Sequence, residues 1–446
     1  MNKIIPSIVL LAFLLAGCEP KPSDTTCADT SCNFSESSGS SSDNSLYIER
    51  IAGMADVGVD IGIEDRTLRE VAEYDASAAL GSAAHPLSRS TSEYIEITTF
   101  EQPDLYGDAY LFQIGDATIA MDFGNHSSSY FSDGASYSSL LRDYYSRYIN
   151  ADHLDLLILS HPHSDHYGGY PALKAEVDSV GMIVDYGYYA SGAEGYRRDI
   201  RDYYVSSGAQ YHRIYDMVNN IEGGMDCTYI TSECFIDWLD AGYYQDVYAD
   251  GPTVDDENVT SVAGILSYRN FTFFFSGDLQ DNSGYSGTGG LGETNLVSLN
   301  DNNDDVFHTV TMMKAGHHGS SKASNNVLLN VLEPKVVTIS AGAPGDDTEY
   351  NGKYGVCGGH PHYDALARFL TQGFKRAIPK IYLNFLNGTT SFVSDGLNDI
   401  YMEGSPLKTS YSGSSSNGEI AKNYGDSIDI YKEMTTTEWA YACHGL

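Results

Sequence analysis

Basic residues are scarce in this chain. Its 446 residues include 25 Lys or Arg and 61 Asp or Glu, which gives a formal net charge of −36. Such a surface repels nucleic acid and anionic membranes at long range, because binding to polyanions relies on Lys and Arg at phosphates. Long nucleic acid is therefore a disfavoured partner, although a metal ion can invert the local field around a small phosphate-bearing molecule.

The apolar run near the N-terminus, residues 4–16, is too short to cross a membrane comfortably. It follows Lys3 and ends in "LAGC", whose cysteine is Cys18. This order of a positive residue, a short apolar segment and small residues before a cysteine resembles a bacterial lipobox. We expect residues 1–17 to be a lipoprotein signal peptide and Cys18 to be lipidated; the alternative is an ordinary signal peptide with an incidental cysteine.

The residues after Cys18 predict how the chain is organised. Residue 19 is Glu rather than Asp, which favours the outer membrane if the source is Gram-negative and the cell surface otherwise. Residues 18–45 are rich in serine and indicate a flexible tether, so the only predicted membrane contact is the lipid anchor. We expect a weakly ordered lead-in over 46–93 and one domain over 94–446.

Cysteine is also infrequent, with seven in the chain. No C-x-x-C is present, which disfavours a thiolate zinc site. Six cysteines remain after Cys18, and an even set in an exported chain is interpreted first as disulfides. Sequence proximity suggests two local pairs and one distant pair among 15 connectivities, namely Cys27–Cys32, Cys227–Cys234 and Cys357–Cys443.

From residue 94 onward, strand-like and helix-like segments alternate. Alternating or continuous apolar residues predict strands, and apolar residues at helical spacing predict helices. Polar motifs follow several of these strands, which indicates a layered α/β (α+β) fold with its site along one rim of the sheets. The tyrosine-rich residues 186–257 and residues 279–305 have few long apolar runs, so we expect insertions or long loops there. The expected strands are 94–100, 109–115, 117–124, 154–160, 181–187, 261–268, 271–278, 307–314, 335–342, 380–386 and 427–432, and the expected helices are 136–149, 168–177, 325–334 and 360–370.

The motif "HPHSDH" follows the apolar run 154–160. His161 and His163 are two residues apart, so at the end of a strand both rings can face one ion. A turn then directs Asp165 and His166 at a second point. Imidazole with carboxylate suits zinc, or iron and manganese where oxygen ligands dominate. The glycines at 168 and 169 permit the tight backbone that starts the next helix.

Further ionisable residues stand at strand ends or helix starts elsewhere in the chain. If their strands are neighbours, these side chains converge on the same rim as the histidine motif. They are Asp122, Asp278, His317, His318, His360 and His362.

These motifs together resemble a known family. "SHPHSDHYGG" is similar to the H-x-H-x-D-H signature of metallo-β-lactamase-fold hydrolases. "FFFSGDL", "KAGHHGS", "GHPHYDAL", "NVTSVAGILSY" and "TTSFVSDG" resemble, more narrowly, the hydrolase domain that ends ComEC-type competence proteins. The resemblance covers about 94–400 and implies an αββα sandwich with a dinuclear metal site, here in a stand-alone lipoprotein.

The resemblance implies a role for each matching residue. His161 and His163 would hold the first ion, Asp165, His166 and His317 the second, and Asp278 would bridge both. Asp122 would orient a ligand histidine. A water or hydroxide shared by two divalent ions would be the nucleophile.

Several positions depart from the pattern or leave alternatives open. Many relatives have a further histidine on the first ion, and the only histidine in that interval is His212, in a context that matches no motif. ComEC-type domains often carry Asp where this chain has His163, and the fuller pair of histidines favours zinc over manganese or iron. Between His317 and His318 we expect the former to be the ligand, because it is nearer the strand end.

The remaining residues are assigned to catalysis or to substrate. We expect Asp165, His318 and His360 to take part in catalysis, His318 as a general acid or a donor to phosphate. Asn258, Lys314 and His362 would support the ligands or face substrate. Lys314 is expected to be a solvated strand residue that can face an anion.

These residues predict an exported metallohydrolase whose substrate is a phosphodiester before a monoester. The charge favours a small or envelope-derived phosphoester. The alternatives are hydrolysis of a lactam, lactone or thioester, and a metal-binding surface lipoprotein without catalysis.

Overall fold

The computed structural model describes a subset of the chain: residues 45–61, 92–103, 106–125, 129–130, 134–149, 152–221, 224–244, 257–281, 290–300, 307–341, 360–361, 363–370 and 379–404. The chain divides into Met1–Ser40 and Ser41–Leu446, and every described residue belongs to the second part. No helix among the described residues is both long and apolar enough to cross a membrane. Cys18, His362 and the expected strand 427–432 lie outside these residues, so the expectations for them stay predictions.

Nine strands form the first sheet, in the order β1-β16-β15-β2-β3-β4-β5-β6-β7. Strands β4 to β7 run parallel, and the pairs from β1 to β4 are antiparallel. Residues 154–159 are all buried, as expected for a parallel strand covered on both faces. The strands are β1 Ala55–Asp60, β2 Ile95–Thr99, β3 Ala109–Ile114, β4 Ala117–Phe123, β5 His153–Leu159, β6 Ser179–Asp185, β7 Gln210–Arg213, β15 Thr390–Ser394 and β16 Asp399–Gly404.

Seven strands form the second sheet, in the order β14-β13-β12-β11-β10-β9-β8. The expected hairpin is confirmed: β10 and β11 are antiparallel, with Arg269 and Asn270 between them. From β11 to β14 the strands are parallel, so their carboxyl ends share one edge. The strands are β8 Cys227–Tyr229, β9 Cys234–Leu239, β10 Ala263–Tyr268, β11 Phe271–Phe275, β12 Met312–Lys314, β13 Val336–Ile339 and β14 Lys380–Leu383.

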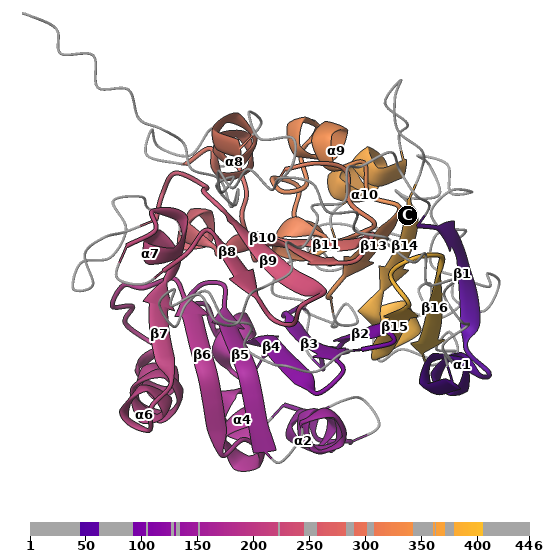
Figure 1. Ribbon diagram of the computed structural model, residues 1–446. Coiled ribbons are helices and arrows are strands. Elements are labelled where there is room, and N and C mark those ends of the chain that lie inside the picture. The colour runs from indigo at the N-terminus through magenta and orange to yellow at the C-terminus, as the bar shows by residue number, and fades with distance from the viewer. Residues whose placement is uncertain are drawn as a thin grey trace, which may run out of the picture. The chain divides into compact units, whose positions relative to one another are not determined.

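Helices cover the outer face of each sheet (Figure 1). In that view α2, α4 and α6 lie below the first sheet, and α8, α9 and α10 lie above the second. The described helices are α1 Ser45–Ile51, α2 Tyr137–Tyr148, α3 Ser164–Tyr167, α4 Tyr170–Glu176, α5 Glu194–Tyr196, η3 Arg197–Arg201, α6 Asp202–Ser206, α7 Ile214–Val218, η4 Glu257–Thr260, α8 Gly292–Asn300, η5 Gly316–Gly319, α9 Asn326–Leu332, α10 Tyr363–Leu370 and α11 Asn384–Asn387. The expected α/β layering is therefore confirmed.

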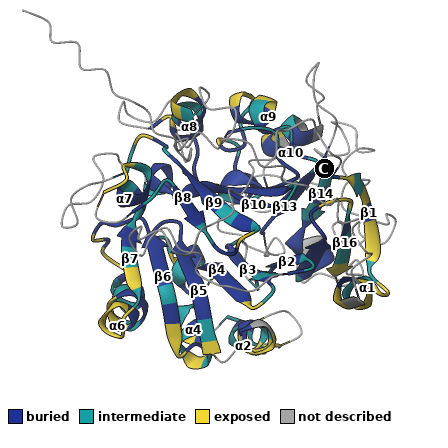
Figure 2. Cartoon of the chain, in the orientation of Figure 1, coloured by how far each residue is buried: buried dark blue, intermediate teal, exposed yellow. Residues whose placement is uncertain are grey.

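Three apolar clusters fill the spaces between the layers, and Figure 2 shows the buried strands at the centre. One cluster lies between the sheets, where the rings of Phe112 on β3 and Phe273 on β11 are 5.3 Å apart. The Tyr110 hydroxyl also reaches the hydroxyls of Thr338 and Ser340, at 3.1 and 3.0 Å. Burial of each large apolar side chain contributes roughly 1.5–3 kcal/mol, so this inner cluster holds the two sheets face to face.

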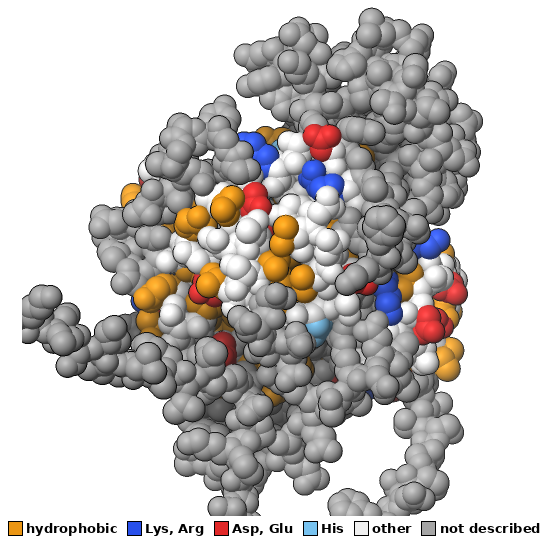
Figure 3. Space-filling model, turned by 90° about the horizontal axis from the view of Figure 1, so that it is seen from above, with side chains coloured by type: hydrophobic (Ala, Val, Ile, Leu, Met, Phe, Trp, Pro, Cys, Tyr) orange, Lys and Arg blue, Asp and Glu red, His pale blue; other side chains and the backbone are white. Residues whose placement is uncertain are grey.

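The face above α8 and α9 exposes few large apolar side chains. Among the described residues these are Leu291, Leu299 and Val327. Figure 3 looks onto the molecule from this side and shows its hydrophobic side chains in small, separated groups. The described part of this face is thus an ordinary solvent-facing layer of helices.

The lead-in over 46–93 is more ordered at its start than we expected. Helix α1 and strand β1 form there, and β1 pairs antiparallel with β16 at the edge of the first sheet. Arg50 of α1 also forms an ion pair with Glu96 of β2, at 2.6 Å. The weak apolar pattern of an edge strand hid this pairing, since β1 is mostly exposed.

The residues expected to be insertions also contribute to both sheets. Over 186–257 the chain forms β7, β8 and β9 together with short helices, and α8 follows within 279–305. These elements are brief, with three residues in β8 and four in β7. Short elements leave little periodic pattern, which is why the expectation of loops was wrong for these described parts.

The expected Cys227–Cys234 disulfide is absent: both cysteines are buried, and neither takes part in a disulfide. In the β8–β9 register Cys227 lies opposite Asp237, three residues beyond Cys234. Three residues of strand span about 10 Å, which is too far for a disulfide. The other four cysteines lie outside the described residues, so their pairing stays a prediction.

Candidate metal centre

The histidine motif forms a sharp turn between β5 and two short helices. Asp165 and His166 lie in α3, and α4 begins at Tyr170 immediately after the glycines. A Cβ atom at Gly169 would lie 2.0 Å from the Phe123 carbonyl oxygen at the end of β4. Only glycine fits that approach, and the motif is thereby held against the neighbouring strand.

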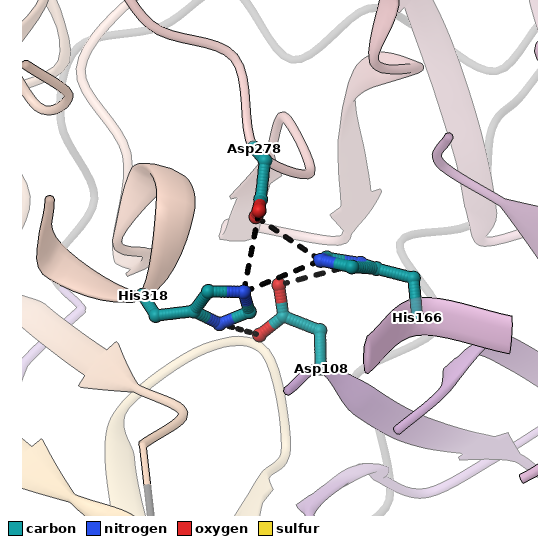
Figure 4. A group of neighbouring side chains, drawn as sticks. All are labelled: Asp108, His166, Asp278 and His318. Atoms are coloured by element: carbon teal, nitrogen blue, oxygen red, sulfur yellow. Dashed lines mark hydrogen bonds and ion pairs between the residues drawn. The ribbon is translucent and has the colours of Figure 1, made fainter. Parts of the chain in front are cut away.

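Four side chains bring their donor atoms together at the buried centre of the site. His166 Nε2 lies 3.2 Å from Asp278 Oδ1, and His318 Nε2 lies 3.3 Å from Asp278 Oδ2. The Nε2 atoms of the two histidines are 3.3 Å apart, and Asp165 Oδ2 lies 3.1 Å from His318 Nε2. Figure 4 shows His166, Asp278 and His318 pointing toward one another from separate elements. The expected convergence of distant motifs on one rim is therefore present.

Asp108 is a buried member of this cluster that sequence reasoning missed. It precedes β3, and the β3–β4 register pairs the next residue, Ala109, with Phe123. Asp108 approaches the Nδ1 side of the rings, at 3.5 Å from His318 and 3.8 Å from His166. The signal that could have revealed it is the Gly107-Asp108 pair directly before an apolar strand.

Lys314 is fully buried beside Asp108 and is not the solvated residue that we expected. Its Nζ lies 2.6 Å from Asp108 Oδ2 and donates to the Gly277 carbonyl oxygen at 2.5 Å. Since this ammonium already neutralises the Asp108 carboxylate, which faces Nδ1 rather than Nε2, we place Asp108 beneath the ligands and not among them. The anion that Lys314 faces is thus part of the protein.

Asp122 supports His166 from the end of β4. Its Oδ1 accepts the Ser160 main-chain N–H at 2.8 Å, and its Oδ2 accepts the Ser160 hydroxyl at 2.8 Å. His166 Nδ1 lies 2.7 Å from Asp122 Oδ2. A proton on Nδ1 leaves the lone pair of Nε2 directed at the centre, as the orienting role expected of Asp122 requires.

The other half of the site is more open. His161 is fully buried, and its Nε2 lies 3.8 Å from Asp278 Oδ2 with no hydrogen-bond partner. The His163 ring lies 4.5 Å from that of His161, and its side chain is 39% exposed. Glu257 Oε2, which the sequence did not single out, lies 3.6 Å from His163 Nε2.

His318, rather than His317, occupies the buried centre, which corrects our expectation. Both residues have left-handed backbone conformations, with φ of 44° and 50°. This pair turns the chain so that the second ring points inward, and distance from the strand end does not decide the order. His317 instead lies at the margin: its Nδ1 is 2.6 Å from Gln280 Oε1, and its Nε2 is 3.5 Å from Asp278 Oδ2.

His360 and Asn258 border the same margin. The His360 ring lies 4.7 Å from that of His317 and 4.9 Å from that of Tyr106, and its buried Nδ1 has no hydrogen-bond partner. Asn258 Nδ2 lies 3.5 Å from His317 Nδ1. His212, in contrast, belongs to the edge strand β7, two strands from the motif-bearing β5.

The acids of the centre favour their ionised forms. Burial raises the pKa of Asp165, but His166 and His318 outweigh it and lower that pKa to about 2. Burial is likewise outweighed at Asp278, where the same two histidines hold the pKa well below its usual range. Both carboxylates are therefore ionised at neutral pH, beside the imidazoles that lower their pKa values.

The imidazoles divide into two groups. Burial lowers the pKa of His161 well below its ordinary value, and the neighbouring His166 lowers it further, so this ring is neutral. At His166 and His318 burial acts in the same direction, but the Asp278 carboxylate and nearby acids raise each pKa well above the ordinary value. A divalent cation could replace the protons that these carboxylates attract.

The donor set fits divalent ions. The buried Nε2 of His161 and Oδ1 of Asp278 have no hydrogen-bond partner, and such atoms are costly to bury unless something binds them. Mixed imidazole and carboxylate donors suit zinc, manganese or iron. The identity of the metal stays a prediction.

Comparison with known proteins agrees with this geometry. Residues 103–221 match the family model of the Metallo-beta-lactamase superfamily. The match contains Asp108, Asp122 and the whole histidine motif, and it ends before Asp278 and His318. The layered architecture is consistent with the metallo-β-lactamase sandwich. The narrower resemblance to ComEC-type domains stays a prediction.

The solved structures that are similar to this chain include the following three proteins, whose descriptions differ. The metallo-beta-lactamase fold protein YhfI from Bacillus subtilis has 12% identity, over 55% of this chain and 85% of its own, with a TM-score of 0.31. A diphosphatase from the PhnP family has 9% identity over 64% and 94%, with a TM-score of 0.32. Human tRNase Z, short form, has 11% identity over 54% and 91%, with a TM-score of 0.30. No curated protein matches the chain in sequence.

Proposed function

We propose that this metallo-β-lactamase superfamily domain is a metal-dependent hydrolase that holds two divalent ions and cleaves a phosphodiester. One observation carries the proposal: Nε2 atoms from two histidines, in short helices that follow strands of different sheets, meet the carboxylates of Asp165 and Asp278 in a buried centre. A solvated turn would not gather such groups away from water, because buried charges need compensation.

The residues divide into two ligand sets around Asp278. Its Oδ1 lies 3.2 Å from His166 Nε2, and its Oδ2 lies 3.3 Å from His318 Nε2 and 3.8 Å from His161 Nε2, so this carboxylate borders both sets. Asp165, His166 and His318 would hold the ion in the buried half, and His161 and His163 the ion in the open half. Two bound ions would supply Lewis-acid polarisation and lower the pKa of a coordinated water.

The margin of the site has groups suited to a phosphoester. His317 and His360 face each other beside the ligand cluster, and His360 Nδ1 is buried without a hydrogen-bond partner. We assign these rings to substrate, with His360 donating a hydrogen bond to a phosphoryl or leaving-group oxygen. We expected His318 to be a general acid or a donor to phosphate, but we assign it to the ligands and therefore assign the contact with substrate to these two rings.

The charge of the chain limits the size of the substrate. A net charge of −36 opposes the grip on a long polyanion that nucleases obtain from Lys and Arg. A small or envelope-derived phosphodiester fits this surface better. An exported protein anchored through Cys18 would meet such a substrate at the cell envelope, and we propose that location.

A substrate panel on the purified chain tests the function. The metal-loaded protein is assayed with a bis-aryl phosphate, an aryl phosphate, DNA, a chromogenic cephalosporin and a lactone. We expect the fastest turnover with the bis-aryl phosphate, and a loss of that activity in Asp165→Ala and His166→Ala. Asp116→Ala, in the exposed turn between β3 and β4, serves as the control.

Two outcomes would contradict the proposal. Metal-loaded protein that cleaves none of these compounds would not be a hydrolase of this kind. Turnover that survives both ligand substitutions would place the chemistry elsewhere, and a preference for the cephalosporin or lactone would replace the phosphodiester with a cyclic amide or ester.

A further inference from the structure

We infer that Glu257 is a ligand of the ion that His161 and His163 hold in the open half of the site. The inference rests on the proposed dinuclear centre and adds a donor that neither the sequence motifs nor the family pattern indicated. It assigns to this glutamate the place that a further histidine takes in many proteins with this signature.

The first observation is the position of Glu257. Its Oε2 lies 3.6 Å from His163 Nε2, a separation that a single ion between the two atoms would span. At zinc–ligand distances of about 2.0–2.2 Å, two donors of one ion lie roughly 3–3.6 Å apart. Glu257 is 35% exposed, so its carboxylate borders the open side of the site rather than the buried centre.

The backbone around Glu257 is fixed to the histidine motif. Glu257 begins η4, whose residues Asn258, Val259 and Thr260 are all buried. Just after η4, the Val262 main-chain N–H donates to the Ser160 carbonyl oxygen at 3.0 Å, beside His161. The Thr260 hydroxyl also donates to the Glu257 carbonyl oxygen at 2.7 Å. The glutamate is therefore attached to the same strand end as the histidines and is held at a defined place.

The second observation is independent of Glu257. His161 Nε2 is fully buried, has no hydrogen-bond partner and lies 3.8 Å from Asp278 Oδ2. A ring nitrogen in that state indicates a bound ligand. An ion held by His161, His163 and Asp278 alone has three protein donors, and Glu257, whose carboxylate lies beside His163, can supply a fourth.

The alternative is a plain ion pair between His163 and Glu257. Both side chains are more than a third exposed, and such a pair contributes about 0–1 kcal/mol. That contact would also leave the Nε2 of His161 buried without a hydrogen-bond partner. A shared ion accounts for both observations, whereas the ion pair accounts for one.

The extra carboxylate changes the expected metal preference. With Glu257 the open half offers two imidazoles and two carboxylates, a set richer in oxygen than a site with three histidines. Oxygen ligands raise the relative affinity for manganese and iron, and imidazoles favour zinc. Glu257→Gln should therefore weaken Mn²⁺ in the open half more than it weakens Zn²⁺.

Metal binding to the full chain tests the inference without an assay of activity. The metal-free protein is titrated with Zn²⁺ and with Mn²⁺ by calorimetry, and the bound metal is counted by mass spectrometry after gel filtration. The variants are Glu257→Gln and Glu257→Ala. The control is Glu403→Gln on β16, an exposed glutamate whose partner is Arg50. Circular dichroism checks that each variant is folded.

We expect two ions in the wild type and in the Glu403→Gln control. Both Glu257 variants should keep one tight ion and bind the other at least tenfold more weakly. In the Co²⁺-loaded protein, the visible absorption of one ion only should change, which the loss of a surface ion pair would not cause.

Failure of the Glu257 assignment can be distinguished from failure of the proposed dinuclear site. If the wild type binds two ions and both Glu257 variants bind them with unchanged affinity, Glu257 is not a ligand and the dinuclear site stands. If the wild type itself binds fewer than two ions, the proposed dinuclear site fails and the inference fails with it.

Discussion

The two halves of the site differ in how they are supported. In the buried half, His166 and His318 are fully buried, and each ring has a partner on its Nδ1 side: Asp122 for the former and the Ser340 carbonyl oxygen for the latter. In the open half, His163 is 39% exposed and has Glu257 as its charged neighbour. Both rings of the buried half are therefore supported, whereas the open half combines the buried ring of His161 with the partly exposed ring of His163.

This difference predicts unequal roles for the two proposed ions. Supporting hydrogen bonds fix the orientation of ligands and raise metal affinity. We therefore expect the buried half to bind its ion more tightly, and the open half to bind more weakly and to face the substrate. The following predictions test that division, from the largest effect to the smallest.

Asp278→Ala should impair both halves of the site and have the largest effect. Asp278 lies between the two halves, within 3.2 to 3.8 Å of nitrogen atoms from His161, His166, His317 and His318. Its loss removes several kcal/mol of stabilisation from a metal-dependent reaction, so turnover should fall about a thousandfold or more. Steady-state kinetics and metal counting check this, and a variant that keeps two ions and normal turnover would exclude Asp278 as the shared ligand.

Lys314→Met should destabilise the buried residues that lie beneath the ligands of the buried half. The Asp108 carboxylate would then be buried without its cation, and breaking one partner of a buried pair costs about 3–5 kcal/mol. The free energy of unfolding in urea should fall by about that amount. The double variant Asp108→Asn/Lys314→Met should recover part of the loss. Equal stability of the single variant and the wild type would show that the pair has no structural importance.

Asp122→Asn should weaken the ion of the buried half and spare the other. The substitution disturbs the acceptor of His166 Nδ1, and such changes reduce metal affinity about 10–100-fold. The control is Asp155→Asn, a buried aspartate that accepts the Thr118 main-chain N–H at 2.9 Å within the sheet. Competition with a chromogenic chelator measures both affinities, and a loss in the control as large as in Asp122→Asn would refute a specific role in orientation.

Glu293→Gln should make the midpoint of thermal unfolding depend less on pH. The difference between this variant and the wild type should change by a few degrees across the pH range. Glu293 accepts the main-chain N–H groups of Ser324 and Asn325, at 2.6 and 2.7 Å, in the loop that follows His318. Burial raises its pKa to about 8. An unfolded glutamate titrates near 4.3, so between about pH 4.3 and 8 the folded state binds the extra proton and stability falls as the pH rises.

The midpoint of thermal unfolding, compared across pH 5 to 9, measures this effect. The wild type should lose stability relative to Glu293→Gln up to about pH 8 and then run parallel to it. Curves that are parallel over the whole range would mean that Glu293 is ionised throughout.

Local pattern made much of the first sheet predictable. Residues 154–159 form a continuous apolar run because β5 is covered on both faces, and the motif that follows is contiguous in sequence. The alternation of apolar and polar residues in β2 and the turn between β3 and β4 could be predicted equally well. Strand β1 was not, because its order comes from pairing with β16 far along the chain.

The site was predictable where its chemistry is carried by a motif and not where it depends on tertiary contacts. Asp108 acts through Lys314, which comes from the other sheet, and no short-range pattern links these two residues. The order of His317 and His318 depends on two left-handed residues that are not glycine. Glu257 has its place because the start of β10 is joined to the end of β5 by a main-chain hydrogen bond.

Anomalous diffraction from crystals of the zinc-loaded protein tests the two-half site most directly. We predict two peaks: a fully occupied one within about 2.0–2.2 Å of donors from Asp165, His166, Asp278 and His318, and a less occupied one bound by His161 and His163 with Asp278 shared. A single peak, or a peak that Asp108 ligates in place of Asp278, would contradict this division of the site.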